Sequence, residues 1–163
     1  MVPFGTPLIL IADDPLQRDE AVRQLIRIGY ADLRGYLDGG IAAWKASGAP
    51  VKRTPLIDVH DLHDWTQQAD APLILDVRFE REWRAGHLPH ALHIEAGQVF
   101  DQINRIPRDR PVVIHCGAAN RAMVSASLLE QHGYTNVTVL DTGYNLWRAA
   151  GYEVEEEVAE LVV

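Results

Sequence analysis

Short apolar runs alternate with amphipathic stretches along this chain, and the alternation limits the possible folds more than any other feature of the sequence. The runs at 8–11, 73–75 and 112–114 read LILI, LIL and VVI, which is typical of buried strands. Helix-like spacing of apolar residues follows them. Strands that alternate with helices predict an α/β protein with a mostly parallel sheet flanked by helices.

The same patterns give the expected extent of each element. The stretch 51–56 follows Pro50, contains Pro55 and is interrupted by charge, which predicts a linker between an N-terminal and a C-terminal part. The expected strands are 8–11, 33–37, 57–59, 73–75, 91–94 and 112–114, and the expected helices are 21–28, 62–67, 79–84, 98–106 and a helix that begins at Asn120.

The N-terminal part resembles the C-terminal part of the same chain. Residues 7–30 align with 111–134 at an offset of 104, and both stretches end in Gly-Tyr. LDGGIAAW, ending at Trp44, aligns with LDTGYNLW, ending at Trp147, at an offset of 103. These shared landmarks indicate a duplication, in which both tryptophans are expected core residues. Ala12 stands where the second copy has Cys116, and 57–110 has no counterpart.

Composition excludes several classes of partner. The 163 residues are 47% hydrophobic, as in a globular protein, and the formal net charge is −8. Such an acidic chain is a poor candidate for binding nucleic acid or an anionic membrane. A single cysteine excludes an internal disulfide framework. With no signal peptide or long apolar run in the sequence, we expect a soluble, cytoplasmic protein.

Cys116 lies on a predicted strand-to-helix turn, which suits an activated thiol. Backbone N–H groups converge on an anion at such a turn, and the N-terminal end of the next helix adds positive potential. Both effects favour the thiolate, which is the nucleophilic form. Arg121 follows five positions later as a fixed cation. The expected anion cradle is the backbone of the intervening residues, namely Gly117, Ala118, Ala119 and Asn120.

On these residues the chain resembles the rhodanese-like sulfurtransferases from about Thr54 to Val154. The resemblance rests on LDVR (75–78), EWRAGHLPHALHI (82–94), VVIHCGAANRA (112–122) and LDTGYNLWRAAG (140–151). It implies a parallel sheet flanked by helices and a cysteine that carries sulfane sulfur as a persulfide, without a cofactor. It also implies a partial inactive unit at 1–53, a catalytic domain at 54–155 and an acidic tail at 156–163.

Such an arrangement is similar to the C-terminal part of fusions between a metallo-β-lactamase-fold persulfide dioxygenase and rhodanese domains. The implied partners are therefore a small-molecule sulfur donor, a thiol acceptor and a missing upstream dioxygenase domain. Alternatively, a homodimer would cover the strand edges that the incomplete first unit leaves open.

The length and charge of the cysteine loop narrow the expected chemistry. Sulfurtransferases of this fold have Cys-x4-Arg spacing, as here, whereas the related phosphatases have Cys-x5-Arg. The commoner rhodanese loop carries Arg or Lys after the cysteine and a glycine two residues later, where this chain has Gly117 and Ala119. A less cationic loop attracts the thiosulfate dianion less well. We therefore expect glutathione persulfide to be preferred over thiosulfate as donor, with a thiol or cyanide as acceptor.

Other polar residues have structural interpretations. Asp76 and Arg78 are expected to form an ion pair that braces the loop, and His115 is expected to be a hydrogen-bonded core residue. His87, His90 and His93 should diverge at a turn, so no metal site is expected. Trp65 or Trp83 could line an acceptor site. A non-catalytic interaction or regulatory module is the alternative to an enzyme, because Ala12 shows that this fold tolerates the loss of the cysteine.

Overall fold

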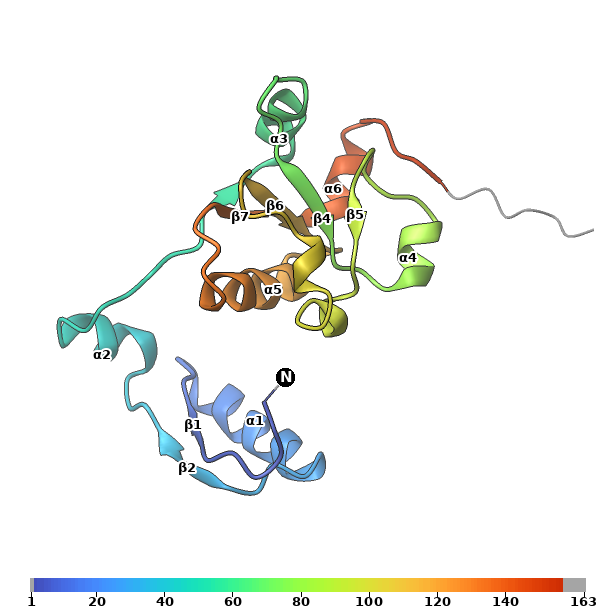
Figure 1. Ribbon diagram of the computed structural model, residues 1–163. Coiled ribbons are helices and arrows are strands. Elements are labelled where there is room, and N and C mark those ends of the chain that lie inside the picture. Colours follow the sequence, from blue (N-terminus) through green and yellow to red (C-terminus); the bar gives the residue numbers. More distant parts are fainter. Residues whose placement is uncertain (1, 157–163) are drawn as a thin grey trace, which may run out of the picture. The chain divides into compact units, whose positions relative to one another are not determined.

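The computed structural model describes residues 2–156 and divides the chain into two compact units, Met1–Arg53 and Thr54–Val163 (Figure 1). The predicted acidic tail, 156–163, lies outside the described residues except for Glu156.

The second unit is built on a parallel sheet of five strands in the order β3-β7-β6-β4-β5. Strand β6, which precedes Cys116, therefore lies in the middle of the sheet and is buried along its whole length. This sheet confirms the predicted parallel α/β fold. The strands are β3 (Leu56–Ile57), β4 (Leu73–Asp76), β5 (Leu92–His93), β6 (Val112–His115) and β7 (Val137–Leu140).

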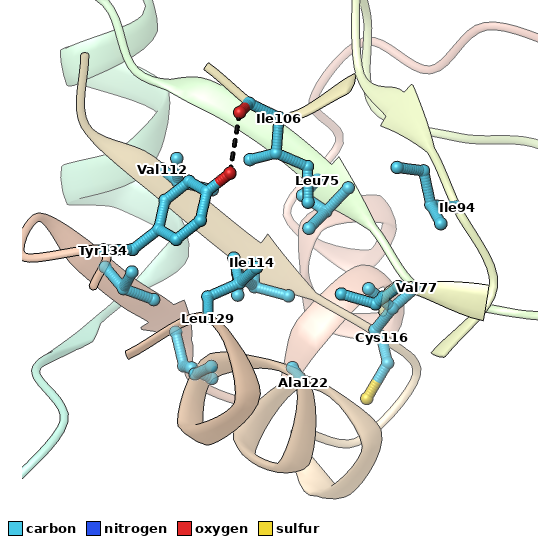
Figure 2. Packing of buried hydrophobic residues seen from close by; sticks show 14 residues of the cluster. Leu75, Val77, Ile94, Ile106, Val112, Ile114, Cys116, Ala122, Leu129 and Tyr134 are labelled. Atoms are coloured by element: carbon cyan, nitrogen blue, oxygen red, sulfur yellow. Dashed lines mark hydrogen bonds between the residues drawn. The ribbon is translucent and has the colours of Figure 1, made fainter. Parts of the chain in front are cut away.

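Helices cover both faces of this sheet, and each face has its own apolar core. Val112 and Ile114 of β6 belong to the core beneath α5, whereas Val113 belongs to the core beneath α3 and α6. This division follows from the alternation of side chains along a strand. Figure 2 shows the core on the α5 side. The helices are α3 (Val59–Thr66), α4 (Glu80–Arg84), α5 (Asn120–Gln131) and α6 (Gly143–Ala149).

The helix predicted at 98–106 is wrong. Two short 3₁₀ turns, Ala96–Gln98 and Ile103–Arg105, take its place. The Tyr134 hydroxyl donates to the carbonyls of Ile103 (3.0 Å) and Ile106 (2.8 Å), the second of which is drawn in Figure 2. The N–H groups of Arg105 and Ile106 donate three residues back, to the carbonyls of Gln102 (2.9 Å) and Ile103 (3.1 Å), so the chain forms tight turns here, and Tyr134 holds the last of them in place.

The strand predicted at 57–59 ends earlier than expected, because Asp58 caps helix α3. Its carboxylate accepts hydrogen bonds from the N–H groups of His60 (2.7 Å) and Asp61 (2.9 Å). A residue with this role has left the strand and opens the next helix.

The first unit has the same β-α-β-α order as the last four main elements of the second. It consists of β1 (Leu8–Leu10), α1 (Pro15–Arg27), β2 (Leu33–Tyr36) and α2 (Gly40–Ala46), and β1 pairs with β2 in parallel. Gly40 alone is buried among residues 2–53. Trp44 is 40% exposed, so its predicted core position is wrong, whereas Trp147 is 3% exposed, as predicted.

The internal repeat extends to local geometry. The indole N–H of Trp44 donates to the carbonyl of Pro50 (3.0 Å), and that of Trp147 donates to the carbonyl of Glu153 (2.9 Å). Both bonds span six residues.

No helix within residues 2–156 is long and apolar enough to cross a membrane.

Candidate functional site

Cys116 directly follows the central strand β6, in the loop that leads into α5. Its side chain is 1% exposed and belongs to the core on the α5 side, where Figure 2 shows its sulfur near the first turn of α5. The cysteine is therefore covered by its neighbours. An open hollow lies beside it, lined by small residues of the loop that follows.

Three consecutive N–H groups after Cys116 are available to a ligand. Those of Gly117, Ala118 and Ala119 donate to no acceptor within residues 2–156. The predicted fourth member of the cradle differs, because the N–H of Asn120 already donates to the carbonyl of Ala118 (2.8 Å). Free N–H groups on such a turn can hold the negative charge of a thiolate or persulfide.

Arg121 forms a two-pronged ion pair with Glu82, a site residue that local sequence spacing does not reveal. The two guanidinium-to-carboxylate distances are 2.7 and 2.9 Å, and each side chain is 30% exposed. The hydrogen bonds from Arg121 lower the pKa of Glu82 from its usual 4.5 to about 2, against the opposing effect of burial. Glu82 in turn raises the pKa of Arg121. The cation of the loop is therefore already neutralised.

Glu82 and the neighbouring Phe79 place this pair beside the loop. Glu82 accepts a hydrogen bond from the N–H of Phe79 (3.1 Å), at the start of α4. The Arg121 guanidinium lies 4.9 Å from the centre of the Phe79 ring, which is 51% exposed. An exposed aromatic side chain therefore borders the site.

The predicted ion pair between Asp76 and Arg78 is present and fully buried. The Arg78 Nε–H donates to both carboxylate oxygens (3.0 and 2.9 Å), and an Nη donates to one of them (2.6 Å). Burial raises the pKa of Asp76, but the charge that His115 carries in acid and the bonds from Arg78 outweigh burial and lower it.

Arg78 also connects this pair to the cysteine loop. Its guanidinium lies over the Tyr144 ring at 3.9 Å, and the Tyr144 N–H donates to the Cys116 carbonyl (2.9 Å). Gly143 allows this close contact, because a Cβ there would lie 2.0 Å from the Cys116 carbonyl oxygen. The ion pair is thus linked through Tyr144 to the backbone of Cys116.

His115 is buried as predicted, but the predicted hydrogen bonding is wrong. Neither ring nitrogen has a hydrogen-bond partner within residues 2–156, although Nε2 lies 3.4 Å from Asp76. Burial lowers the pKa of His115 to about 4, so the ring is neutral at pH 7. A neutral ring avoids placing a second charge beside Arg78.

The three histidines of the GHLPHALH stretch lie in different environments. His87 and His93 both stack on Trp83, with ring centres 3.5 and 4.8 Å from it, whereas the His90 side chain is 93% exposed. Within the described part of the chain, no group of three or more His, Cys, Asp or Glu residues could hold a metal ion. Trp83 therefore packs against histidines.

Comparison with known proteins places these features in a family. Residues 58–150 match the sequence profile described as "Rhodanese-like domain". The chain is 30% identical over 82 residues to thiosulfate sulfurtransferase GlpE of Pseudomonas entomophila, covering 50% of this chain and 75% of that protein. It is 32% identical over 155 residues to the HTH-type transcriptional regulator Rv0324 of Mycobacterium tuberculosis, covering 85% of this chain and 66% of that protein.

The solved structures agree with the sequence matches. The crystal structure of a rhodanese-related protein from Thermoplasma volcanium superposes with a TM-score of 0.58 at 25% identity, covering 63% of this chain and 99% of that one. With the cysteine loop after the central strand and the family profile over most of the second unit, the chain belongs to the rhodanese-like family.

Proposed function

We propose that this protein is a sulfurtransferase in which Cys116 carries sulfane sulfur as a persulfide. The observation that carries the proposal is the row of free N–H groups at Gly117, Ala118 and Ala119, directly after the only cysteine. These donors stabilise a sulfur anion attached to Cys116. The similarity to thiosulfate sulfurtransferases supports the same chemistry.

The reaction has two steps, which balance without an added oxidant. The Cys116 thiolate attacks the outer sulfur of the donor, whose S–S bond breaks to release sulfite from thiosulfate or a thiolate from a persulfide. An acceptor thiolate or cyanide ion then attacks the outer sulfur of the Cys116 persulfide. The electron pair of that S–S bond returns to Cys116 as thiolate, and the acceptor leaves as a persulfide or as thiocyanate.

The ion pair at Arg121 favours a persulfide donor over thiosulfate. Glu82 neutralises the one cation of the loop, so little net positive charge is left to attract a dianion. We infer that glutathione persulfide is the better donor and that thiosulfate reacts more slowly.

The first unit has no role in this chemistry. Ala12 replaces the cysteine, and Asp13 and Asp14 follow it where the second unit has a neutral loop. We propose that residues 1–53 are an inactive partial rhodanese-like unit, that 54–155 is the catalytic domain, and that both act in the cytoplasm downstream of a dioxygenase domain.

Intact mass spectrometry tests the proposal. After incubation with glutathione persulfide, the protein should gain one sulfur atom that cyanide removes, and Cys116→Ser should gain none, because a hydroxyl cannot form a persulfide. The control is Cys116→Ser combined with Ala12→Cys, which returns a thiol at the repeat position. Neither variant should transfer sulfur. Transfer by Cys116→Ser would overturn the mechanism.

The similarity to a transcriptional regulator favours a second candidate, a sensory or interaction module. Such a module would form the Cys116 persulfide but pass it slowly to small acceptors. Turnover with cyanide, measured beside the mass gain, separates the two functions.

A further inference from the structure

The hollow beside the cysteine loop has a volume of about 480 Å³, a size suited to a small organic ligand. One wall is the backbone and small side chains of Gly117, Ala118 and Ala119, whose N–H groups are free. The other wall comes from the turn before α6 and from its first residues. The hollow therefore borders the loop residues that form the proposed persulfide cradle.

The wall opposite the loop carries the one charged residue that lines the hollow, Asp141. The remaining residues of this wall, Thr142, Asn145 and Leu146, are uncharged, and Asp141 forms no ion pair within residues 2–156. Because Arg121 is neutralised by Glu82, the unpaired carboxylate of Asp141 sets the sign of the charge at this entrance.

The backbone that holds Asp141 is strained, which points to a use beyond stability. Thr142 has a left-handed conformation (φ 59°), which is costly for a β-branched residue. Its counterpart in the first unit, Gly39, has φ 71° at no such cost. The copy that lacks the cysteine thus has the relaxed residue, and the copy with the cysteine has the strained one. Strain of this kind is found at functional sites.

Thr142 and Asp141 also fix one another. The Thr142 N–H donates to the Asp141 carboxylate (2.9 Å), and its hydroxyl donates to the Asp141 carbonyl (2.5 Å). The next two residues, Gly143 and Tyr144, pack against the Cys116 carbonyl. The carboxylate is therefore held at a fixed place relative to the cysteine loop.

We propose that Asp141 is a specificity-determining residue that binds the ammonium group of a small thiol whose sulfur exchanges with Cys116. This inference rests on the proposed sulfurtransferase function and names the class of thiol that the site accepts best, an amine-bearing one. A carboxylate-bearing thiol without an ammonium group is repelled by the same charge.

Three acceptors of similar size test the proposal: cysteamine, 2-mercaptoethanol and 3-mercaptopropionate, which are cationic, neutral and anionic. The measured quantity is the ratio of kcat/KM for cysteamine to that for 3-mercaptopropionate. Dividing the ratio of the unmodified protein by that of Asp141→Asn cancels the intrinsic reactivities of the thiols. We expect this quotient to be about three to ten, because one exposed charge near its partner has an effect of that size. The quotient should fall toward one in high salt, which screens the charge.

Asp38→Asn is the matched control, because Asp38 holds the same position in the unit without a cysteine and its removal changes the net charge equally. Its ratio should equal that of the unmodified protein. A quotient near one for Asp141→Asn, with sulfur still passed to 2-mercaptoethanol, would overturn this inference and leave the proposed function standing. Failure to pass sulfur to any acceptor, cyanide included, would instead overturn the proposed function and this inference with it.

Discussion

Ala119 holds a left-handed backbone conformation (φ 62°) at the residue before α5. A residue with a Cβ pays about 1–2 kcal/mol for this conformation, whereas glycine does not. The strain explains why the commoner loop of this family has glycine at the equivalent place. Ala119 also carries the last of the three free N–H groups, and αL residues occur in backbone turns that bind anions.

Replacing Ala119 with glycine should therefore stabilise the protein. The gain from relieved strain exceeds the extra unfolded-state entropy of glycine by about 0.5–1 kcal/mol, which is a rise in melting temperature of a few degrees. Ala118→Gly is the control, because the φ of Ala118 is not positive, so only the entropic cost applies and stability should fall. Calorimetry on both variants measures the difference. Equal effects would show that Ala119 is not strained.

At the residue scale, the sequence predicted the positions that depend on neighbours in the chain. Arg121 follows Cys116 by five positions, in the first turn of α5, and Asp76 and Arg78 pair across one residue, so local spacing was enough. Glu82 could not be identified in this way, because it meets Arg121 across 39 residues and two separate helices. The orphaned ring of His115 likewise depends on how neighbouring strands place Asp76.

Helices α4 and α5 are joined beside the active loop by the pair of Glu82 and Arg121. Glu82→Gln should release the guanidinium to an anionic donor, so kcat/KM for thiosulfate should rise about three- to tenfold. Glu80→Gln is the control, because Glu80 pairs with Arg84 on the same helix and does not contact the loop. A fall in the rate for Glu82→Gln would show that the carboxylate is needed to position Arg121.

The unfolding free energy of Glu82→Gln should depend on pH differently from that of the unmodified protein. The pKa of Glu82 is lowered to about 2, so the pair contributes stability that is complete above pH 4.5 and is lost as the pH falls toward 2. Because the pair is partly exposed, its contribution is at most about 1 kcal/mol. The unfolding free energies of the unmodified protein and Glu82→Gln should thus differ at pH 6 and converge near pH 2.

Elements were predictable from sequence where local pattern and tertiary contacts agree. Strand β6 and helix α5 follow from the VVI run and the helical spacing after Asn120. The segment 98–106 has helical spacing too, yet Tyr134 reaches it from 28 residues away and binds its carbonyls. No periodicity within the segment contains that information.

At the scale of the whole molecule, the first unit lacks a cover for one face of its two-stranded sheet. Ile9 and Ile11 are 70% and 59% exposed, and Trp44 is 40% exposed. At the repeat offset, Ile9 corresponds to Val113 and Trp44 to Trp147, which are buried in the core beneath α3. The first unit has no counterpart of α3, and the absence of that cover explains why the prediction of a buried Trp44 was wrong. Each such side chain would gain about 1.5–3 kcal/mol from burial.

We propose that a second copy of the chain covers this face. Light scattering, which measures the mass of the particle in solution, tests the proposal. The unmodified protein should have a mass twice that of the 18.2 kDa chain, and Ile9→Ser with Ile11→Ser should shift it toward the monomer, because two apolar contacts are lost. Val124→Ser is the control, since Val124 is 71% exposed on α5 of the complete unit and should leave the mass unchanged. A monodisperse monomer that binds no hydrophobic dye would contradict the dimer. It would equally contradict an uncovered face, because exposed apolar surface of this extent binds such dyes.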